Sequence, residues 1–289
     1  MGKLHVQEKK EKVKIGVTGN PKKKKIGSIL TEIKEIVPGE SLVFDEELSP
    51  FLDPGDRKVS IEELPMYADV LLSFGGDGTL LRTARYSHGL PVAGVNIGAL
   101  GFLTVFRVDE VKRLVKSILE NNFKIEERMV LRAYRPEKAE EFIALNDISI
   151  HVTGSSRMID IEVETGGEVL NRYRADGVIV ATPTGSTAYN LAAGGPIVYP
   201  GMKAIIITPI CAHTLSVRPV ILPSNIYLKI TTSSKGAEKI LLSADGQHEA
   251  LLEDGESIEI TECHNRVKLV RLDDTPGFFE ILRKKLGWG

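Results

Sequence analysis

Phe74-Gly75-Gly76-Asp77-Gly78-Thr79-Leu80-Leu81 is the stretch that decides the fold of this chain of 289 residues. It follows Asp69–Ser73, an apolar run typical of a buried strand, and leads into Leu80–Tyr86, which suits a helix. The carboxylate of Asp77 is thereby placed among three glycines at the end of a strand, where open α/β sheets bind ligands. The alternative interpretation is an ordinary strand-to-helix turn, in which the Asp-Gly pair supplies backbone freedom.

The segments around this stretch predict an N-terminal Rossmann-like domain with a parallel sheet. Asn96–Leu103 forms a second glycine-spaced loop after the next strand, and we expect the two loops to share a ligand crevice at one edge of the sheet. Lys22–Lys25 follows the first strand. Two interpretations of these four lysines are open: a contact with phosphates, or an ordinary solvated loop. The expected strands are 13–18, 41–44, 69–73 and 91–96, and the expected helices are 26–37, 80–86 and 109–121.

The second half of the sequence changes character and predicts a mostly antiparallel β domain. Few segments with helical periodicity interrupt its strands, and Gly166-Gly167 is typical of a hairpin turn. A short helix is expected to begin at Pro276, with an apolar face from Phe278 to Leu286 that must pack against another element. The expected strands are 129–134, 142–152, 158–165, 168–174, 178–182, 204–208, 226–231, 239–243 and 257–260.

Composition gives no bulk argument for binding nucleic acid or membranes, because the formal net charge is −2 and the charged fraction an ordinary 26%. No apolar stretch approaches the roughly 18 residues that span a bilayer. Met1–Lys14 is polar and lysine-rich, unlike a secretory signal. Cys211 and Cys263 lie far apart without metal-ligand spacing, so we expect a reduced, cytoplasmic protein and no metal held by protein ligands alone.

Three polar segments of the second domain are candidates for a site. Asp176–Asn190 reads as a strand, a hydroxyl-rich glycine turn and a short helix, whose amides and hydroxyls suit an anion or a ribose. The alternative is a helix capped by its own Ser and Thr residues. Leu145–Ile148 carries Asn-Asp in an expected mid-strand position, which is also typical of an edge strand or turn, and Ser243–Gln247 is the third segment.

Taken together, these segments resemble the NAD kinase family, which phosphorylates the 2′-hydroxyl of the adenosine ribose of NAD to give NADP. The resemblance covers Val70 to about Gln247. The Gly-Gly-Asp-Gly loop by itself is shared with phosphofructokinases and diacylglycerol-type lipid kinases. Its combination with Asn96–Phe102, Asn146-Asp147, Asp176–Tyr189 and Thr208–Pro219 in this order is specific.

The resemblance implies roles for residues of the first domain. Asp77 is the carboxylate aimed at the ribose 2′-hydroxyl, as general base or as its orienter. Gly76 and Gly78 let backbone and phosphate approach closely, and Phe102 lines the adenine pocket. The lysine run, with Lys22 and Lys23, is the candidate contact for the phosphate donor, which is ATP or polyphosphate with Mg²⁺ or another divalent metal.

In the second domain, Asn146 and Asp147 are implied to grip the ribose hydroxyls and adenine of NAD, and Asp176 its nicotinamide end. The family's usual pair is Asn-Glu, so Asp147 is one methylene shorter, and Ala192 replaces a frequent Ser. The remaining implied substrate-binding residues are Thr187, Ala188, Tyr189 and Gln247.

For the architecture, the resemblance implies a discontinuous first domain of residues 1–127 with 265–289, a β-rich NAD-binding domain of residues 128–264, and a homodimer or homotetramer. Two alternatives to a NAD kinase remain. A lipid kinase would share the glycine loop but gives no reason for Asp176–Tyr189, whereas a non-catalytic dinucleotide sensor would keep the pocket and tolerate loss of Asp77.

Overall fold

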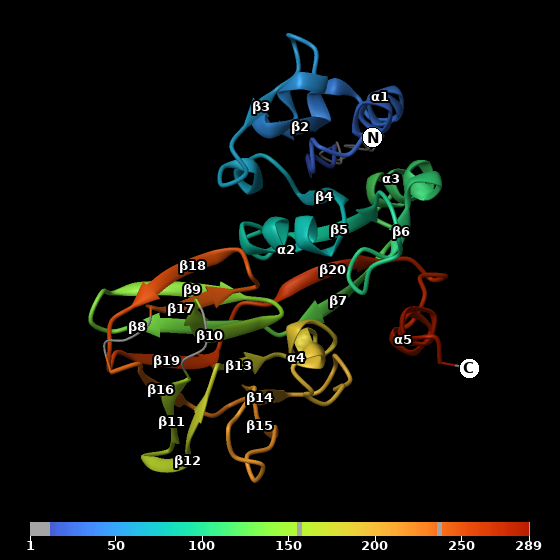
Figure 1. Cartoon of the computed structure of the whole chain (residues 1–289). Helices are drawn as coiled ribbons and strands as arrows, with labels where there is room; N and C mark the ends of the chain where they lie inside the picture. The colour runs from blue at the N-terminus through green and yellow to red at the C-terminus, as the bar shows by residue number, and fades with distance from the viewer. Residues whose placement is uncertain (1–11, 155–157, 236–238, 289) are drawn as a thin grey trace, which may run out of the picture. The chain divides into compact units, whose positions relative to one another are not determined.

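The computed structural model describes residues 12–154, 158–235 and 239–288, which group by contacts into two units (Figure 1). Unit 1 comprises residues up to 125 together with 270–275, and unit 2 comprises residues 126–269 together with 276–289. The predicted boundary between residues 127 and 128 lies close to this division. Of the segment 265–289, which the resemblance implies for the first domain, the grouping by contacts places 270–275 in unit 1 and the residues on either side in unit 2.

Unit 1 is an α/β layer built on the parallel strands β3-β2-β1-β4-β5, with β6 paired to β5 (Figure 1). β1, β2 and β4 are buried along their whole length, as parallel strands covered on both faces require. The strands are β1 (Ile15–Gly19), β2 (Leu42–Asp45), β3 (Lys58–Val59), β4 (Val70–Gly75), β5 (Pro91–Asn96) and β6 (Phe106–Arg107).

The helices of unit 1 follow the predicted pattern except where α2 starts. The predicted helix began at Leu80, but α2 begins at Asp77, with Gly76 as its N-cap. Asp77 therefore lies in the first turn, where an acidic side chain complements the helix dipole. The helices are α1 (Ile26–Ile36), α2 (Asp77–Arg85) and α3 (Val111–Leu119), with short 3₁₀ turns η1 (Gly39–Ser41), η2 (Glu46–Phe51), η3 (Leu64–Met66) and η4 (Val108–Glu110).

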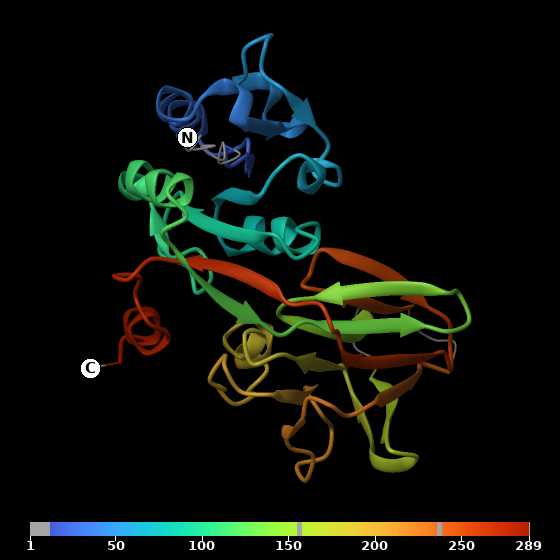
Figure 2. The ribbon, with the colours of Figure 1, turned by 180° about the vertical axis from the view of Figure 1, so that it is seen from behind.

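Unit 2 contains two six-stranded antiparallel sheets, so the predicted fold class is confirmed (Figures 1 and 2). One has the order β15-β14-β13-β10-β17-β18, the other β12-β11-β16-β19-β8-β9. The strands are β8 (Leu131–Arg135), β9 (Glu140–Ala144), β10 (Asp147–Thr153), β11 (Ile159–Thr165), β12 (Glu168–Ala175), β13 (Gly177–Ala181), β14 (Ala204–Ile210), β15 (Val220–Pro223), β16 (Leu228–Ser233), β17 (Lys239–Ala244), β18 (His248–Leu252) and β19 (Ser257–Glu262).

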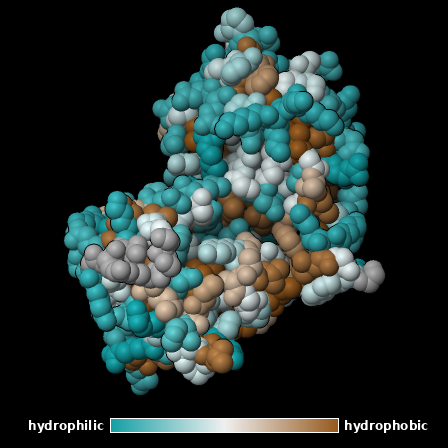
Figure 3. Space-filling view, in the orientation of Figure 1, coloured by the Kyte–Doolittle hydropathy of each residue, from teal (hydrophilic) through white to brown (hydrophobic). Residues whose placement is uncertain are grey.

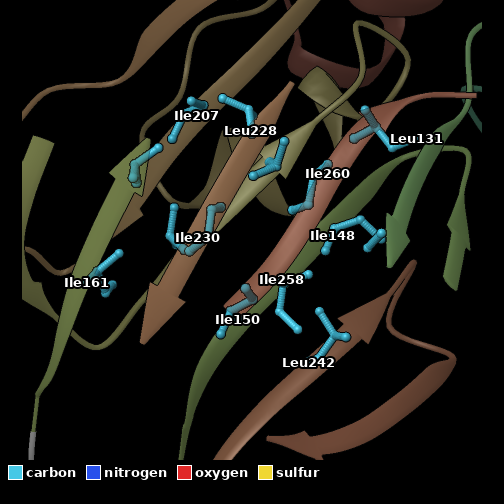
Figure 4. Close-up of a cluster of buried hydrophobic side chains, with 14 of the residues drawn as sticks. Leu131, Ile148, Ile150, Ile161, Ile207, Leu228, Ile230, Leu242, Ile258 and Ile260 are labelled. Carbon is cyan, nitrogen blue, oxygen red and sulfur yellow. The ribbon is translucent and has the colours of Figure 1, made fainter. Parts of the chain in front are cut away.

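Alternating side chains from both sheets fill the core of unit 2 (Figure 4). Ile148 and Ile150 of β10 belong to the same buried cluster as Ile258 and Ile260 of β19. The Gly166-Gly167 hairpin is confirmed, since both residues have positive φ, as a two-residue turn of this kind requires.

The predicted strand 142–152 is wrong as a single element. β9 ends at Ala144 and β10 begins at Asp147, and these two strands belong to different sheets. Leu145 and Asn146 form the bend that carries the chain from one sheet to the other. The residues on both sides of Asn146-Asp147 have the pattern of a strand, so periodicity did not decide between a continuous strand and a turn at this pair.

The remaining elements of the described chain are short. α5 starts at Phe278 with Gly277 as its N-cap, two residues after the predicted start at Pro276. The rings of Phe278 and Phe279 each lie 5.7 Å from that of Tyr199, which joins α5 to the rest of unit 2. These elements are β7 (Lys124–Arg128), η5 (Gly185–Thr187), α4 (Tyr189–Ala192), β20 (Val267–Arg271) and α5 (Phe278–Leu286).

Hydrophilic residues cover most of the face seen in Figure 3, and hydrophobic residues show there as separate patches. Aromatic side chains with large exposed fractions include Tyr199, Phe279 and Trp288. Within the described residues, none of the helices has the length and apolar character needed to cross a bilayer.

The close packing of β13 on β10 predicts that Gly177→Ala destabilises the chain. A Cβ at Gly177 would lie 2.4 Å from the carbonyl oxygen of Ile150 and 2.7 Å from Cβ of His151. We expect a loss of about 1–3 kcal/mol in the free energy of unfolding, measured by urea denaturation followed by circular dichroism. Gly39→Ala is the control, because its Cβ would meet nothing within 4 Å. Equal stability of the two variants would contradict the packing described.

Candidate functional site

The Asp77 stretch connects the end of β4 to the start of α2 without a longer loop. Gly75 is required by packing, because its Cβ would lie 2.1 Å from Oγ1 of Thr79. Gly76 is different: a Cβ there would meet nothing within 4 Å. Packing within the chain therefore does not explain the glycine at residue 76, which leaves open space beside the backbone at the start of α2.

The Asp77 carboxylate is bound by the second glycine loop. Its Oδ2 accepts a hydrogen bond from the amide of Phe102 at 2.7 Å, and its Oδ1 accepts from the amides of Leu103 at 3.1 Å and Thr104 at 3.0 Å. The hydroxyl of Thr104 also donates to Oδ1 at 2.8 Å. The predicted meeting of the two loops is thus observed, and Asp77 is the residue that joins them.

Two residues of this arrangement were missed by sequence reasoning. Gly101 allows the close approach, because a Cβ there would lie 2.0 Å from Oδ1 of Asp77. Thr104 supplies two of the donors and itself accepts a hydrogen bond from Nδ2 of Asn96 at 2.8 Å. The glycine spacing of Asn96–Leu103 signalled a tight loop, but nothing in it identified Asp77 as the loop's partner.

The lysine run lies at the same edge of the parallel sheet. The amide of Asn20 donates to the carbonyl oxygen of Phe74 at 2.8 Å, which ties the turn after β1 to the end of β4. Lys22 and Lys23 are exposed in that turn. Both interpretations, a solvated turn and a phosphate contact, fit this position.

In unit 2, the predicted polar segments converge on the bend at Leu145–Asp147. Asp245 accepts hydrogen bonds from the amides of Leu145 at 3.0 Å, Asn146 at 2.7 Å and Asp147 at 3.2 Å. From the other side, Thr182 donates through its hydroxyl to the carbonyl oxygen of Leu145 at 2.6 Å and through its amide to that of Asn146 at 2.8 Å.

The glycine turn packs directly on this bend. A Cβ at Gly185 would lie 2.0 Å from the carbonyl oxygen of Asn146, so only glycine fits there. The amide of Gly185 donates to Oγ1 of Thr182 at 3.0 Å. The structure therefore brings together three segments that the sequence offered as separate candidates: the Asn146-Asp147 pair, the turn 182–187 and the turn at Asp245–Gln247.

Asp147 is the most perturbed acid of this cluster. Its residue is 5% exposed, and burial, followed by the charge of Asp245, raises the pKa of its carboxyl from 3.8 to about 7. Burial also raises the pKa of the Tyr189 phenol, with further contributions from Cys211, Asp147 and Asp176. These contributions place Tyr189, Asp147 and Asp176 in one electrostatic environment, which is typical of a functional site.

The hydroxyl-rich turn is used mainly for structure. Ser186 is fully buried, and its hydroxyl donates to the carbonyl oxygen of Pro183 at 2.7 Å and accepts from the amide of Val198 at 3.0 Å. Thr184 accepts from the buried guanidinium of Arg128 at 3.3 Å. The expected anion seat made of free hydroxyls is therefore not observed at Ser186, because the chain's own backbone uses that hydroxyl.

The short helix α4 is held by Asn190, which sequence reasoning also missed. Its side chain donates to the carbonyl oxygens of Ser186 and Pro196 at 3.0 Å each and accepts from the hydroxyl of Thr208 at 2.6 Å. Thr187 and Ala188 are half-buried, and Tyr189 is 42% exposed, so the apolar surface of α4 remains open. Gln247 is exposed in the turn after β17.

Comparisons with known proteins cover nearly the whole chain. Residues 6–123 match the model of the ATP-NAD kinase N-terminal domain, and residues 145–272 match that of the ATP-NAD kinase C-terminal domain. The chain is 41% identical over 240 residues to an NAD kinase of Geobacter sulfurreducens, covering 81% of this chain and 84% of that protein. It is 39% identical to an NAD kinase of Moorella thermoacetica, covering 96% and 90%.

Solved structures agree with the fold. Yeast NADH kinase, complexed with NADH, matches with a TM-score of 0.86 and 28% identity, covering 97% of this chain and 89% of that chain. An NAD kinase from Archaeoglobus fulgidus in complex with ATP matches with a TM-score of 0.73 and 24% identity, covering 96% and 100%, and this second likeness shows the fold alone.

The environment of Asp147 predicts a pH dependence of stability. The pKa of Asp147 is about 7 in the folded chain and about 3.8 in the unfolded chain. Between these two values the unfolded chain has lost the proton and the folded chain keeps it, so a rise in pH favours the unfolded chain. Asp147 therefore lowers the free energy of unfolding by up to about 1.4 kcal/mol per pH unit between pH 4 and 7, and adds no further slope above pH 7.

We expect Asp147→Asn to remove this slope, measured by urea denaturation between pH 5 and 8. Asp109→Asn, which changes an aspartate with a 68% exposed side chain, is the control and should keep the wild-type slope. An Asp147→Asn variant with the wild-type slope would show that Asp147 does not titrate in this window.

Proposed function

The chain belongs to the ATP-NAD kinase family, and we propose that Asp77 is the carboxylate with which it acts on NAD. The chain is an enzyme that phosphorylates NAD to NADP, and the acceptor is the 2′-hydroxyl of the adenosine ribose. Both family models, which together span residues 6–123 and 145–272, carry this conclusion. The lipid kinase alternative fails because it accounts for the glycine loop only.

The geometry of the Asp77 carboxylate supports its role. Oδ1 accepts three hydrogen bonds, whereas the one described for Oδ2 comes from the amide of Phe102. Oδ2 thus accepts fewer hydrogen bonds than Oδ1, and its second lone pair can accept one from a substrate hydroxyl. Because Oδ1 is fixed by the loop, the remaining position of Oδ2 has a defined direction, which is what a positioned general base needs.

In the proposed reaction, the 2′-hydroxyl oxygen attacks the terminal phosphorus of the donor. The new P–O bond forms as the bond to the leaving oxygen breaks, and the hydroxyl proton passes to Oδ2 of Asp77. A ribose hydroxyl is a poor nucleophile at neutral pH, and general-base help is worth ~10²–10⁴ in rate.

Unit 2 supplies the proposed grip on NAD. Asn146 and Asp147, on a bend held from both sides, bind the ribose hydroxyls and adenine, and Asp176 binds the nicotinamide end. The exposed ring of Tyr189, with Ala188 beside it, offers an apolar face on which a base can stack. Thr187 and Gln247 complete the proposed set from the two adjoining turns.

The phosphate donor is proposed to lie along the start of α2. The open space beside Gly76 admits a phosphate against backbone amides, with Gly78 in the same turn, and an N-terminal helix end favours negative charge. Lys22 and Lys23 are proposed as further contacts. The described residues contain no group of three or more His, Cys, Asp or Glu side chains placed to hold a metal. Mg²⁺ is thus proposed to enter with the donor's phosphates, whose charge it neutralises.

We further propose a cytoplasmic enzyme that assembles as a homodimer or homotetramer, with ATP or polyphosphate as donor. Analytical ultracentrifugation tests the assembly directly. A mass of two or four chains at micromolar concentration is expected, and a single-chain mass across that range would contradict it.

The catalytic proposal is tested by Asp77→Asn, assayed with NAD, ATP and Mg²⁺ for formation of NADP. The amide cannot take up the hydroxyl proton, so we expect turnover to fall ~10²–10⁴-fold while calorimetry shows retained NAD binding. Asp109→Asn is the matched control, since it changes an exposed aspartate of the same unit.

Near-normal turnover of Asp77→Asn would exclude the base role. If the wild-type chain binds NAD but makes no NADP from any phosphate donor, the sensor interpretation takes the place of the kinase.

A further inference from the structure

The bend at Leu145–Asp147 is where the chain leaves one sheet of unit 2 for the other. β9 ends at Ala144 beside β8, and β10 begins at Asp147 beside β13 and β17. Backbone amides at such a crossing are not paired in the hydrogen-bond ladder of either sheet, so they need other acceptors. The two side chains proposed to grip NAD, those of Asn146 and Asp147, are carried by this crossing.

Asp245 supplies the acceptors for three consecutive amides of the bend, at 2.7–3.2 Å. Its own backbone is suited to this, because a positive φ of 54° turns the chain between β17 and β18 and its amide donates to the carbonyl oxygen of Asp147 at 2.9 Å. Aspartate tolerates this backbone region better than most residues. The contact joins residues about one hundred positions apart in the sequence.

The arrangement has an electrostatic consequence for Asp147. Asp245, which holds the three amides, lies close enough to Asp147 to add to the raised pKa of that buried carboxyl. Asp147 also contributes, with Cys211 and Asp176, to the raised pKa of the Tyr189 phenol of α4. Asp245 thus fixes the position of Asp147 and, after burial, contributes to its raised pKa.

We infer that Asp245 is a positioning residue of the NAD site, which holds Asn146 and Asp147 in place without itself touching the dinucleotide. This inference rests on the proposed function of Asn146 and Asp147 as the NAD grip. It assigns Asp245 a task that its place in an exposed turn does not suggest.

The test is Asp245→Asn, in which one amide oxygen replaces two carboxylate oxygens and an NH₂ group faces a backbone donor. Calorimetry with NAD should show an affinity lower by roughly 10- to 100-fold, the equivalent of one charge-assisted hydrogen bond. Ionised Asp147 accepts hydrogen bonds from ribose hydroxyls, so wild-type affinity should rise with pH through about 7. In the variant the midpoint of this rise should move to lower pH, because the like charge is gone.

Asp254→Asn is the matched control within unit 2. Asp254 also accepts from backbone amides of a remote turn, those of Ser234 at 2.6 Å and Lys235 at 3.1 Å, but has no part in the bend. It should keep both the wild-type NAD affinity and the wild-type midpoint. A role of Asp245 in general stability alone would lower the free energy of unfolding but leave the NAD affinity of the folded variant unchanged, which would overturn the inference.

Wild-type affinity and midpoint in Asp245→Asn would overturn the inference. Should that variant not fold, Asp245→Glu replaces it, because it keeps the charge on a longer arm. Weaker NAD binding with an unchanged midpoint supports the inference, and wild-type affinity overturns it. These binding measurements are separate from the proposed function: a wild-type chain that binds NAD without making NADP would refute the kinase activity and leave Asp245 testable.

Discussion

One kind of interaction supports both parts of the proposed site: a side-chain carboxylate that accepts hydrogen bonds from three consecutive backbone amides of a remote loop. Asp77 does this for residues 102–104 in unit 1, and Asp245 does it for residues 145–147 in unit 2. Loops that leave regular structure carry amides without ladder partners, and leaving such donors unpaired in a buried setting costs about 1–3 kcal/mol each. One aspartate, with two oxygens, satisfies three of them at once.

The two carboxylates differ in whether they take part in the proposed reaction themselves. Asp77 keeps an acceptor position on Oδ2, so the residue that orders the loop is also placed to receive a proton. Asp245 only holds the bend in place. The side chains proposed to bind NAD are those of Asn146 and Asp147, which lie on the bend. Fixing both loops before substrate arrives lowers the ordering cost of binding and of the reaction, which is the main means of catalysis in phosphoryl transfer.

Much of this could be predicted from sequence, because local patterns determined it. The strand before Asp77, the second glycine loop and the change to antiparallel strands follow from periodicity and turn residues. The bend at Asn146 remained one of two interpretations of the Asn-Asp pair, because the segments on either side of it both have the pattern of a strand and periodicity does not separate them. The partnership of Asp245 with that bend joins residues about one hundred positions apart, and the need for Gly101 arises from the closeness of Asp77 and Thr104. Such contacts are set by tertiary packing, which a single sequence does not display.

Amide hydrogen exchange followed by NMR tests the two-carboxylate account most directly. In the wild-type chain, the amides of residues 102–104 and 145–147 should exchange slowly, although all of them except that of Asp147, the first residue of β10, lie outside regular strands and helices. Asp77→Ala, which removes both acceptor oxygens, should release the first group alone, and Asp245→Ala the second alone. Exchange of these amides at the rate of exposed turns in the wild-type chain, or release of both groups by either variant, would contradict the account.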